Sequence, residues 1–283
     1  MTVIRTGEVV GETTLPCPPE QLVEMMFGKI VVPADREDAS LGVPALRLDG
    51  VTLHDRLLTT DDLSLEVAAG EVIGLAGLEG SGQRMLLQAC TGLLKPGHGS
   101  LHLAGRDMTG LAYREFMDAG VHYLPAGRLE EGLVAGLTIT EHLLLASREY
   151  DFFVDWDGAR ARAAELIEEF SIKGTPDSPA ESLSGGNQQR LLLAMMPPRI
   201  RLLLMEHPTR GLDIESADWV WTTLLRRRDE GTAIVFASAD LDELLRYSDR
   251  ILVFFSGRVI SVRDARATSG EQLGHLIGGR EVA

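Results

Sequence analysis

The sequence predicts an α/β fold that combines buried parallel strands with helices, a smaller antiparallel sheet and an inserted group of helices. Apolar runs at residues 72–76 and 202–205 are typical of buried parallel strands, and a glycine-rich turn and a helix follow the first. Apolar and polar residues alternate, as in half-buried antiparallel strands, at residues 46–48, 63–67 and 100–103. The apolar pattern of residues 139–182 predicts mainly helices. A compact part of roughly 240 residues can bury one core with an inserted subdomain.

The glycine-rich turn after the first buried strand reads Gly-Leu-Glu-Gly-Ser-Gly-Gln-Arg from Gly77 to Arg84. Its glycines fit the pattern G-x-x-x-x-G-K-[ST], whose backbone N–H groups cradle phosphates. In that pattern Lys reaches the β- and γ-phosphates and Ser or Thr ligates Mg²⁺, but Gln83 and Arg84 stand here. We therefore expect the backbone cradle to persist, with a weaker positive charge beside the phosphates. An ordinary strand-to-helix turn is the alternative. The candidate nucleotide-binding residues of this turn are Gly77, Glu79, Gly80, Ser81, Gly82, Gln83 and Arg84.

The string Leu-Ser-Gly-Gly-Asn-Gln-Gln-Arg at residues 183–190 has no generic structural reason to exist and resembles the signature motif of ABC-type ATPases. In that family the serine and the glycines begin a helix, where free N–H groups and the helix dipole offer an anion site. The family forms head-to-tail dimers in which one copy's signature closes over the γ-phosphate held by the other copy. The resemblance therefore implies that Ser184, Gly185 and Gly186 act on a partner's ATP. A serine N-cap with flexible glycines is the alternative.

The apolar run at residues 202–205 continues into Glu206-His207-Pro208-Thr209, which resembles the family's Walker B segment. There an Asp orders Mg²⁺ and a Glu polarises the attacking water, so the resemblance assigns these catalytic places to Glu206 and His207. Glu206 remains a hard carboxylate ligand, whereas an imidazole lacks a fixed negative charge. A strand-end histidine that is hydrogen-bonded to the backbone is the alternative for His207. Residues 210–213 correspond to the D-loop, which crosses the family's dimer interface.

The family's switch histidine, which contacts the γ-phosphate of its own subunit, is replaced by Ala239 in the string Ser238–Glu243. Gln83, His207 and Ala239 thus all depart from the catalytic pattern. Loss of one such donor or base costs roughly ten- to thousandfold in rate. Rapid unaided turnover at this chain's own phosphate loop is therefore not expected.

Residues 121–133 resemble the Q-loop turn in the carboxy-terminal halves of sugar and nucleoside importer ATPases. Those halves usually read Pro-Glu-Asp-Arg there, and this chain keeps Pro125 and Arg128 but not the two acids. The resemblance makes Arg128 a further candidate for nucleotide binding. A polar surface turn is the alternative. The family often stacks adenine on an aromatic residue, and His54 is the only candidate ring in the corresponding stretch.

The two ends of the chain resemble each other, because residues 2–10 align with residues 252–260 and a short helix is expected after each. We therefore expect residues 1–33 to resemble the tail of a preceding nucleotide-binding domain. Residues 34–44 would be a linker and residues 45–283 an ABC nucleotide-binding domain, with a helical subdomain at about residues 129–195. A simple amino-terminal extension is the alternative.

The net charge of −15 argues against a nucleic-acid partner, because phosphate contacts need clustered Lys and Arg. Cys17 and Cys90 have no metal-binding spacing, which favours free thiols. No apolar run approaches the length of a membrane span. The family's helical subdomain receives a coupling helix from a transmembrane partner. Phe152, Phe153 and Trp156 could line that contact, but aromatic core packing is the preferred interpretation.

The resemblance implies an ABC nucleotide-binding domain of the P-loop, RecA-like type that serves as the second half of the ATP-binding subunit of a sugar or nucleoside importer. ATP and Mg²⁺ are the implied cofactors, weakly held or absent at the chain's own site, and hydrolysis is expected only with a partner. The implied partners are a second nucleotide-binding domain, as a separate chain or a homodimer, and transmembrane permease subunits. The implied location is cytoplasmic, at the inner face of the membrane. The alternatives are a self-sufficient ATPase that uses Arg84 and a non-hydrolytic interaction module.

Overall fold

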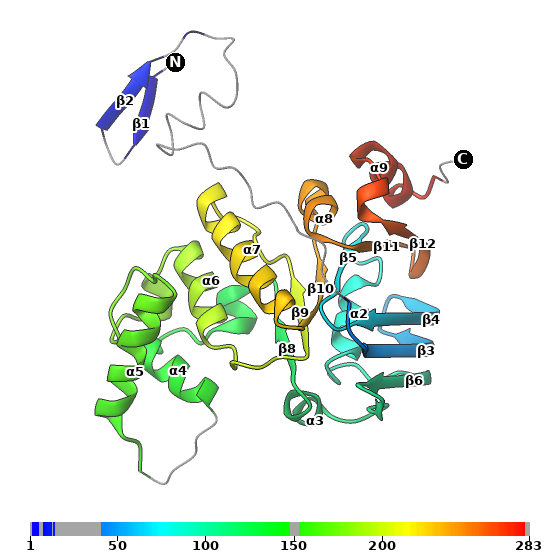
Figure 1. Ribbon diagram of the computed structural model, residues 1–283, viewed down its shortest axis with the longest axis horizontal. Coiled ribbons are helices and arrows are strands. Elements are labelled where there is room, and N and C mark those ends of the chain that lie inside the picture. The colour runs from blue at the N-terminus through cyan, green and yellow to red at the C-terminus, as the bar shows by residue number, and fades with distance from the viewer. Residues whose placement is uncertain (1, 6–7, 13, 15–40, 148–152, 281–283) are drawn as a thin grey trace.

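Two sheets and a group of helices make up most of the computed structural model, which describes residues 2–5, 8–12, 14, 41–147 and 153–280 (Figure 1). The larger sheet has the strand order β12-β11-β5-β10-β9-β8, and the smaller has the order β4-β3-β6-β7. Helices α4 (Ile139–Ser147), α5 (Trp156–Glu169) and α6 (Gly185–Ala194) lie on one side of the larger sheet. Strands β3 (Pro44–His54), β4 (Thr59–Ala68) and β6 (His98–Leu103) lie on the other side (Figure 1). The predicted α/β fold with an antiparallel sheet and a helical insertion is confirmed.

The larger sheet is parallel except at one edge. Its strands are β5 (Val72–Ala76), β8 (Val121–Leu124), β9 (Leu202–Glu206), β10 (Ala233–Ala237), β11 (Arg250–Phe255) and β12 (Arg258–Asp264). Only β12 runs antiparallel to its neighbour. Every residue of β5, β9 and β10 is buried, which explains why these strands read as unbroken apolar runs. The carboxyl ends of the parallel strands meet at one edge of the sheet.

Two separate apolar cores lie on the two faces of this sheet. Successive side chains of a strand point to opposite faces, so Leu202 and Leu204 join one core while Leu203 and Met205 join the other. The Leu203 core includes buried residues of the helices α4 to α9. The Leu202 core includes the antiparallel sheet and helix α2, which therefore covers the second face.

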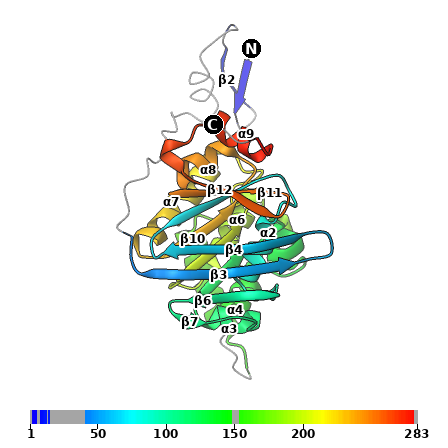
Figure 2. The same cartoon turned by 90° about the vertical axis from the view of Figure 1, so that its right-hand side faces the viewer.

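The antiparallel sheet crosses the front of the molecule in Figure 2. Its strands are β3 (Pro44–His54), β4 (Thr59–Ala68), β6 (His98–Leu103) and β7 (Arg106–Asp107). In β4 the buried Leu63, Leu65 and Val67 alternate with exposed residues, as the predicted half-buried strand requires.

The longer helices connect the strands or form the insertion. Their bounds are α2 (Gln83–Ala89), α3 (Tyr113–Asp118), α4 (Ile139–Ser147), α5 (Trp156–Glu169), α6 (Gly185–Ala194), α7 (Ile214–Asp229), α8 (Leu241–Tyr247) and α9 (Gly270–Ile277). Short turns of helix are η1 (Arg128–Gly132), η2 (Ala180–Ser182) and η3 (Ala265–Ala267). Helix α6 ends at Ala194, shortly before Pro197 and Pro198, which cannot continue a helix because proline lacks the backbone N–H.

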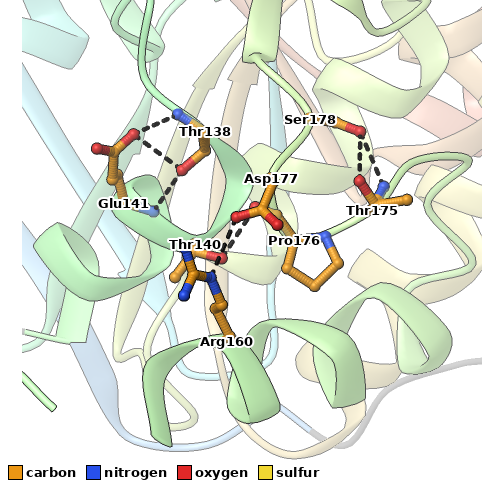
Figure 3. Close-up of polar contacts among 8 residues, drawn as sticks. All are labelled: Thr138, Thr140, Glu141, Arg160, Thr175, Pro176, Asp177 and Ser178. Atoms are coloured by element: carbon orange, nitrogen blue, oxygen red, sulfur yellow. Dashed lines mark hydrogen bonds and ion pairs between the residues drawn. The ribbon is translucent and has the colours of Figure 1, made fainter. Parts of the chain in front are cut away.

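Side-chain hydrogen bonds hold the helical insertion together (Figure 3). At the start of α4, the backbone N–H and the hydroxyl of Thr138 donate to Glu141 Oε2 at 2.7 and 2.8 Å. The hydroxyl of Thr140 donates to the carbonyl of Pro176 at 2.9 Å, and Arg160 Nε of α5 donates to Asp177 Oδ1 at 3.2 Å. Both helices are therefore tied to the segment before the signature motif.

The expectation that the aromatic residues near 153 pack in the core is wrong. Phe153 is 83% exposed and Trp156 is 46% exposed. Phe152 lies outside the described residues. Within the described part, none of the helices combines the length and the apolar character needed to span a bilayer.

Near the amino terminus, the segment that aligns with residues 252–260 forms the hairpin β1 (Thr2–Arg5) and β2 (Glu8–Glu12), which pair antiparallel as β11 and β12 do. The short helix expected after this segment and most of the linker expected at residues 34–44 lie outside the described residues, as does Cys17. Cys90 is buried as a free thiol, and burial raises its pKa to about 12.

His122 on β8 makes stability depend on pH. Burial lowers its pKa to about 4, and Arg227 adds to the shift, so the folded chain holds a neutral imidazole. The unfolded chain takes up a proton at about pH 6.5, so stability is full above that pH and falls toward pH 4. Between pH 7 and pH 4 we expect the free energy of unfolding to fall by about 3 kcal/mol less in His122→Gln than in wild type.

The measurement is urea denaturation of both proteins between pH 7 and pH 4. The exposed His98 on β6 is the matched control, and His98→Gln should leave the pH profile unchanged. Parallel curves for wild type and His122→Gln would contradict the assignment.

Candidate functional site

A cavity of about 940 Å³ lies at the carboxyl ends of β5, β9 and β10. It brings together most of the residues predicted for nucleotide binding and catalysis. Those that line it are Gly77, Glu79, Gly80, Gly82, Gln83, Arg84, Glu206, His207 and Ala239. Ser81 is buried within the glycine turn and does not line the cavity. Carboxyl ends of parallel strands are the usual position of ligand sites in open α/β sheets.

The glycine turn keeps the backbone form of a phosphate cradle. Gly80 has φ of 80° and Gly82 has φ of 121°, values that side chains disfavour. A Cβ atom on Gly77 would lie 2.5 Å from Gln83 Nε2 and 2.7 Å from the carbonyl of Phe254. Among the described residues, the N–H groups of Gly80, Gly82 and Gln83 have no hydrogen-bond partner. These groups can therefore hold an anion.

The side chain of Gln83 serves the turn itself. It is 8% exposed, and its Nε2 donates to the carbonyl of Leu78 at 3.3 Å. The amide therefore stabilises the turn and brings no charge to the cavity.

Arg84 lies between two carboxylates. Its Nη2 is 2.5 Å from Glu131 Oε1, and its Nη1 is 3.5 Å from Glu206 Oε2. The hydrogen bond to Glu131 raises the pKa of Arg84, so the guanidinium stays charged. The hydroxyl of Tyr123 donates to Glu206 Oε1, while burial and this hydrogen bond raise the pKa of Tyr123. Both oxygens of Glu206, which is only 6% exposed, therefore face a partner.

The residues present do not fit a Mg²⁺ ion at this position. Mg²⁺ requires oxygen ligands, whereas Arg84 brings N–H donors and its own positive charge. In the described part of the chain, no group of three or more His, Cys, Asp or Glu residues could hold a metal ion. The assignment of Glu206 as a metal ligand stays a prediction, and in this structure its neighbours are a guanidinium and a phenol.

His207 follows β9 with φ of 47°, in the left-handed region. Its backbone N–H donates to the carbonyl of Ala237 at 2.8 Å. Burial lowers the pKa of His207, with Arg210 as the second cause, so the imidazole is neutral at pH 7. No hydrogen bond joins this ring to the described residues. A neutral ring here can orient water but lacks the charge of a glutamate.

Glu243 of α8 was not assigned a role from the sequence, although it closes the string at residues 238–243. It is 6% exposed and accepts three hydrogen bonds. Its Oε1 accepts from Thr209 at 2.5 Å and from the indole of Trp221 at 2.8 Å, and its Oε2 accepts from Ser238 at 2.5 Å. The loop after β9 and the loop carrying Ala239 are thereby fixed to one carboxylate.

The signature residues lie outside this cavity. Ser184 is the exposed N-cap of α6, and its Oγ accepts from Asn187 Nδ2 at 2.8 Å. Gly185 and Gly186 form the first turn, half-buried, with N–H groups that bond to none of the described residues. Neither they nor Ser184 line the 940 Å³ cavity. The helix start is free to receive an anion from outside the chain.

Arg128 lies beside the signature helix. Its Nε donates to Gln189 Oε1 at 2.9 Å, and its Nη2 donates to the carbonyl of Arg210. Arg128 does not line the 940 Å³ cavity, and neither does the predicted ring of His54, whose neighbour Asp55 does. The structure therefore places Arg128 between the signature helix and the carbonyl of Arg210, and its role in nucleotide binding stays a prediction.

A second cavity, of about 1090 Å³, lies beside η1 and the end of β8. Arg84 and Gln88 line both cavities, whereas Tyr123 and Glu131 line only the second.

Comparison with known proteins gives concordant results. The family model described as "ABC transporter" matches residues 60–210. The chain is 36% identical over 293 residues to the guanosine import ATP-binding protein NupO of Bacillus subtilis, covering 99% of this chain and 57% of that protein. It is 35% identical over 293 residues to the glucose import ATP-binding protein TsgD13 of Haloferax volcanii, covering 99% of this chain and 53% of that protein. The chain thus spans about half the length of these relatives.

Among solved structures, the dimeric structure of MJ0796, a bacterial ABC transporter cassette, is similar with a TM-score of 0.66. The match has 22% identity and covers 79% of this chain and 100% of that chain. At this identity the likeness concerns the fold.

Removal of the Glu243 carboxylate should destabilise the site strongly. Glu243→Ala leaves three buried or half-buried donors without their partner, so we expect a loss of about 3 kcal/mol or more in the free energy of unfolding. Urea denaturation measures it. The exposed Asp242 on the same helix is the control, and Asp242→Ala should cost less than about 1 kcal/mol. Equal losses for the two variants would refute the role of Glu243.

Proposed function

The chain belongs to the ABC transporter family, and on that premise we propose that it is the ATP-binding subunit of an importer for a sugar or a nucleoside-like solute. The relatives named for guanosine and glucose import support this class of solute. Both match nearly the whole of this chain.

The chain's own nucleotide site is proposed to be regulatory or structural. Its glycine turn retains free N–H groups for phosphate, so the residues fit the phosphates of ATP in part. Gln83, Arg84, His207 and Ala239 replace the lysine, the metal-ligating hydroxyl, the glutamate and the histidine that hydrolysis needs. Bound ATP would supply a triphosphate here without rapid turnover.

The signature motif is proposed to complete the ATP site of a second nucleotide-binding domain. The observation that carries this proposal is the separation of Ser184 and its glycines from the chain's own cavity, together with the unbonded N–H groups at the start of α6. A helix of ten residues directs its N-terminal dipole at that point. Head-to-tail pairing with a partner would bring a foreign γ-phosphate to this helix start.

Transmembrane permease subunits are the second proposed partner, with the chain attached to the inner face of the membrane through them. The exposed Phe153 and Trp156 on the helical insertion and the 1090 Å³ cavity support this assignment. No nucleic-acid partner is proposed, given the net charge of −15.

We also propose that the chain corresponds to the second half of a longer two-domain arrangement. Residues 1–33 would belong to the tail of a first domain, residues 34–44 to a linker, and residues 45–283 to the second domain. The resemblance of the hairpin β1–β2 to β11–β12, and the half-length matches to the relatives, support this.

The trans role can be tested by complementation between two versions of this chain. A restored chain carries five substitutions that return the catalytic pattern of the family: Gln83→Lys, Arg84→Ser, Glu206→Asp, His207→Glu and Ala239→His. It also carries Ser184→Arg, which disables its own signature. Wild type is the second chain, with an intact signature and a changed phosphate loop.

Only the mixed dimer then contains a complete hydrolytic site. We expect ATP hydrolysis in the mixture at least about a hundredfold above either chain alone, because loss of one phosphate-stabilising donor has costs of that order. Steady-state phosphate release measures it. The restored chain with Ser184 intact should turn over ATP alone, which shows that the five substitutions work.

Two results would overturn the proposal. The first is a mixture whose hydrolysis is unaffected when wild type is replaced by its Ser184→Arg variant. The second is rapid turnover by wild type alone that is lost in Arg84→Ala, which would favour a self-sufficient ATPase.

A further inference from the structure

The position where the phosphate-loop pattern puts a metal-ligating hydroxyl holds a fixed cation instead. Arg84 stands there, at the start of α2, and its guanidinium lies within 3.5 Å of Glu206, the residue in the metal-ordering place of the Walker B segment. In the sequence pattern these two positions share one Mg²⁺ ion. In this structure they share an ion pair.

The ion pair is not an ordinary surface contact. Exposed pairs contribute little because water screens them, but Glu206 is only 6% exposed. A buried carboxylate needs a compensating charge or donors, and Tyr123 supplies just one hydrogen bond. The positive charge beside Glu206 is thus supplied by the chain.

The same guanidinium remains accessible from the cavity. The Arg84 side chain is 51% exposed and lines the cavity together with the glycine turn. Its contacts with Glu131 and Glu206 use Nη2 and Nη1, and the Nε–H group has no hydrogen-bond partner among the described residues. An arginine has five N–H donors and binds phosphate in a fork, so it can hold a phosphate oxygen and a carboxylate together.

We propose that Arg84 takes the place of Mg²⁺ at this site, so that the chain binds a nucleoside triphosphate or diphosphate in its metal-free form. This inference rests on the proposed function in so far as the site binds a nucleotide. Mg²⁺ in solution then competes with the protein for the phosphates. Binding is therefore at least as tight in EDTA as in excess Mg²⁺.

The experiment is calorimetric titration of the full chain with ATP, once in EDTA and once in excess MgCl₂. The ratio of the two dissociation constants, EDTA over Mg²⁺, is the readout. For wild type we expect a ratio of one or less. For Arg84→Ser, which restores a metal-ligating hydroxyl, we expect a ratio of about ten or more, because Mg²⁺ replaces the lost positive charge in MgCl₂ whereas nothing replaces it in EDTA.

Arg210→Ser is the matched control, because Arg210 also lines the cavity but forms no ion pair with a described carboxylate. It can weaken ATP binding in both buffers, but its ratio should stay at one or less. Glu131→Gln should likewise leave the ratio at one or less, because Arg84 keeps its charge. Thermal unfolding without ligand verifies that each variant is folded.

The outcomes distinguish the metal-free binding mode from the presence of a nucleotide site. Wild-type ATP binding that requires Mg²⁺ overturns the inference and leaves the proposed nucleotide site in place. A ratio for Arg84→Ser equal to that of wild type also overturns it. Absence of ATP binding in both buffers removes the nucleotide site of the proposed function, and the inference with it.

Discussion

A carboxylate buried at the end of a central strand must find partners, and this requirement organises the site. Glu206 closes β9, with 6% of its surface exposed. Tyr123 reaches it from the neighbouring strand β8, and Arg84 reaches it from the first turn of α2. Glu131 holds the other side of the guanidinium. The glycine turn, two strands and the η1 turn are thereby joined through one negative charge.

A second buried carboxylate performs a similar task in the segments that follow β9 and β10. Glu243 gathers Thr209, Trp221 and Ser238 from three different segments. The loop with Ala239 is therefore held in place although the side chain of Ala239 has no group that could contact a phosphate. The scaffold of the site is retained. The proposal that the start of α6 acts on a partner's ATP rests on the side chains that depart from the catalytic pattern of the family, which are Gln83, His207 and Ala239.

The strand pattern, the glycine turn and the start of α6 could be predicted from the sequence, because each depends on residues close together in the chain. Apolar runs predicted β5 and β9, and the alternation of apolar and polar residues predicted β4. The direction of long side chains could not be predicted. Arg84 meets a partner 47 residues away and Tyr123 one 83 residues away, so their rotamers depend on tertiary packing. The exposure of Phe153, the position of Arg128 and the role of Glu243 escaped prediction for the same reason.

Arg84 and Gln88, which both belong to α2, form part of the wall between the two cavities. One face of that wall meets the glycine turn, and the other meets Glu131 and the surface beside η1. A molecule that enters the outer cavity therefore approaches the acid that restrains Arg84. The guanidinium of Arg84 is at the same time paired with Glu206, which lines the inner cavity. Replacement of Arg84 therefore alters the lining of both cavities and removes both ion pairs.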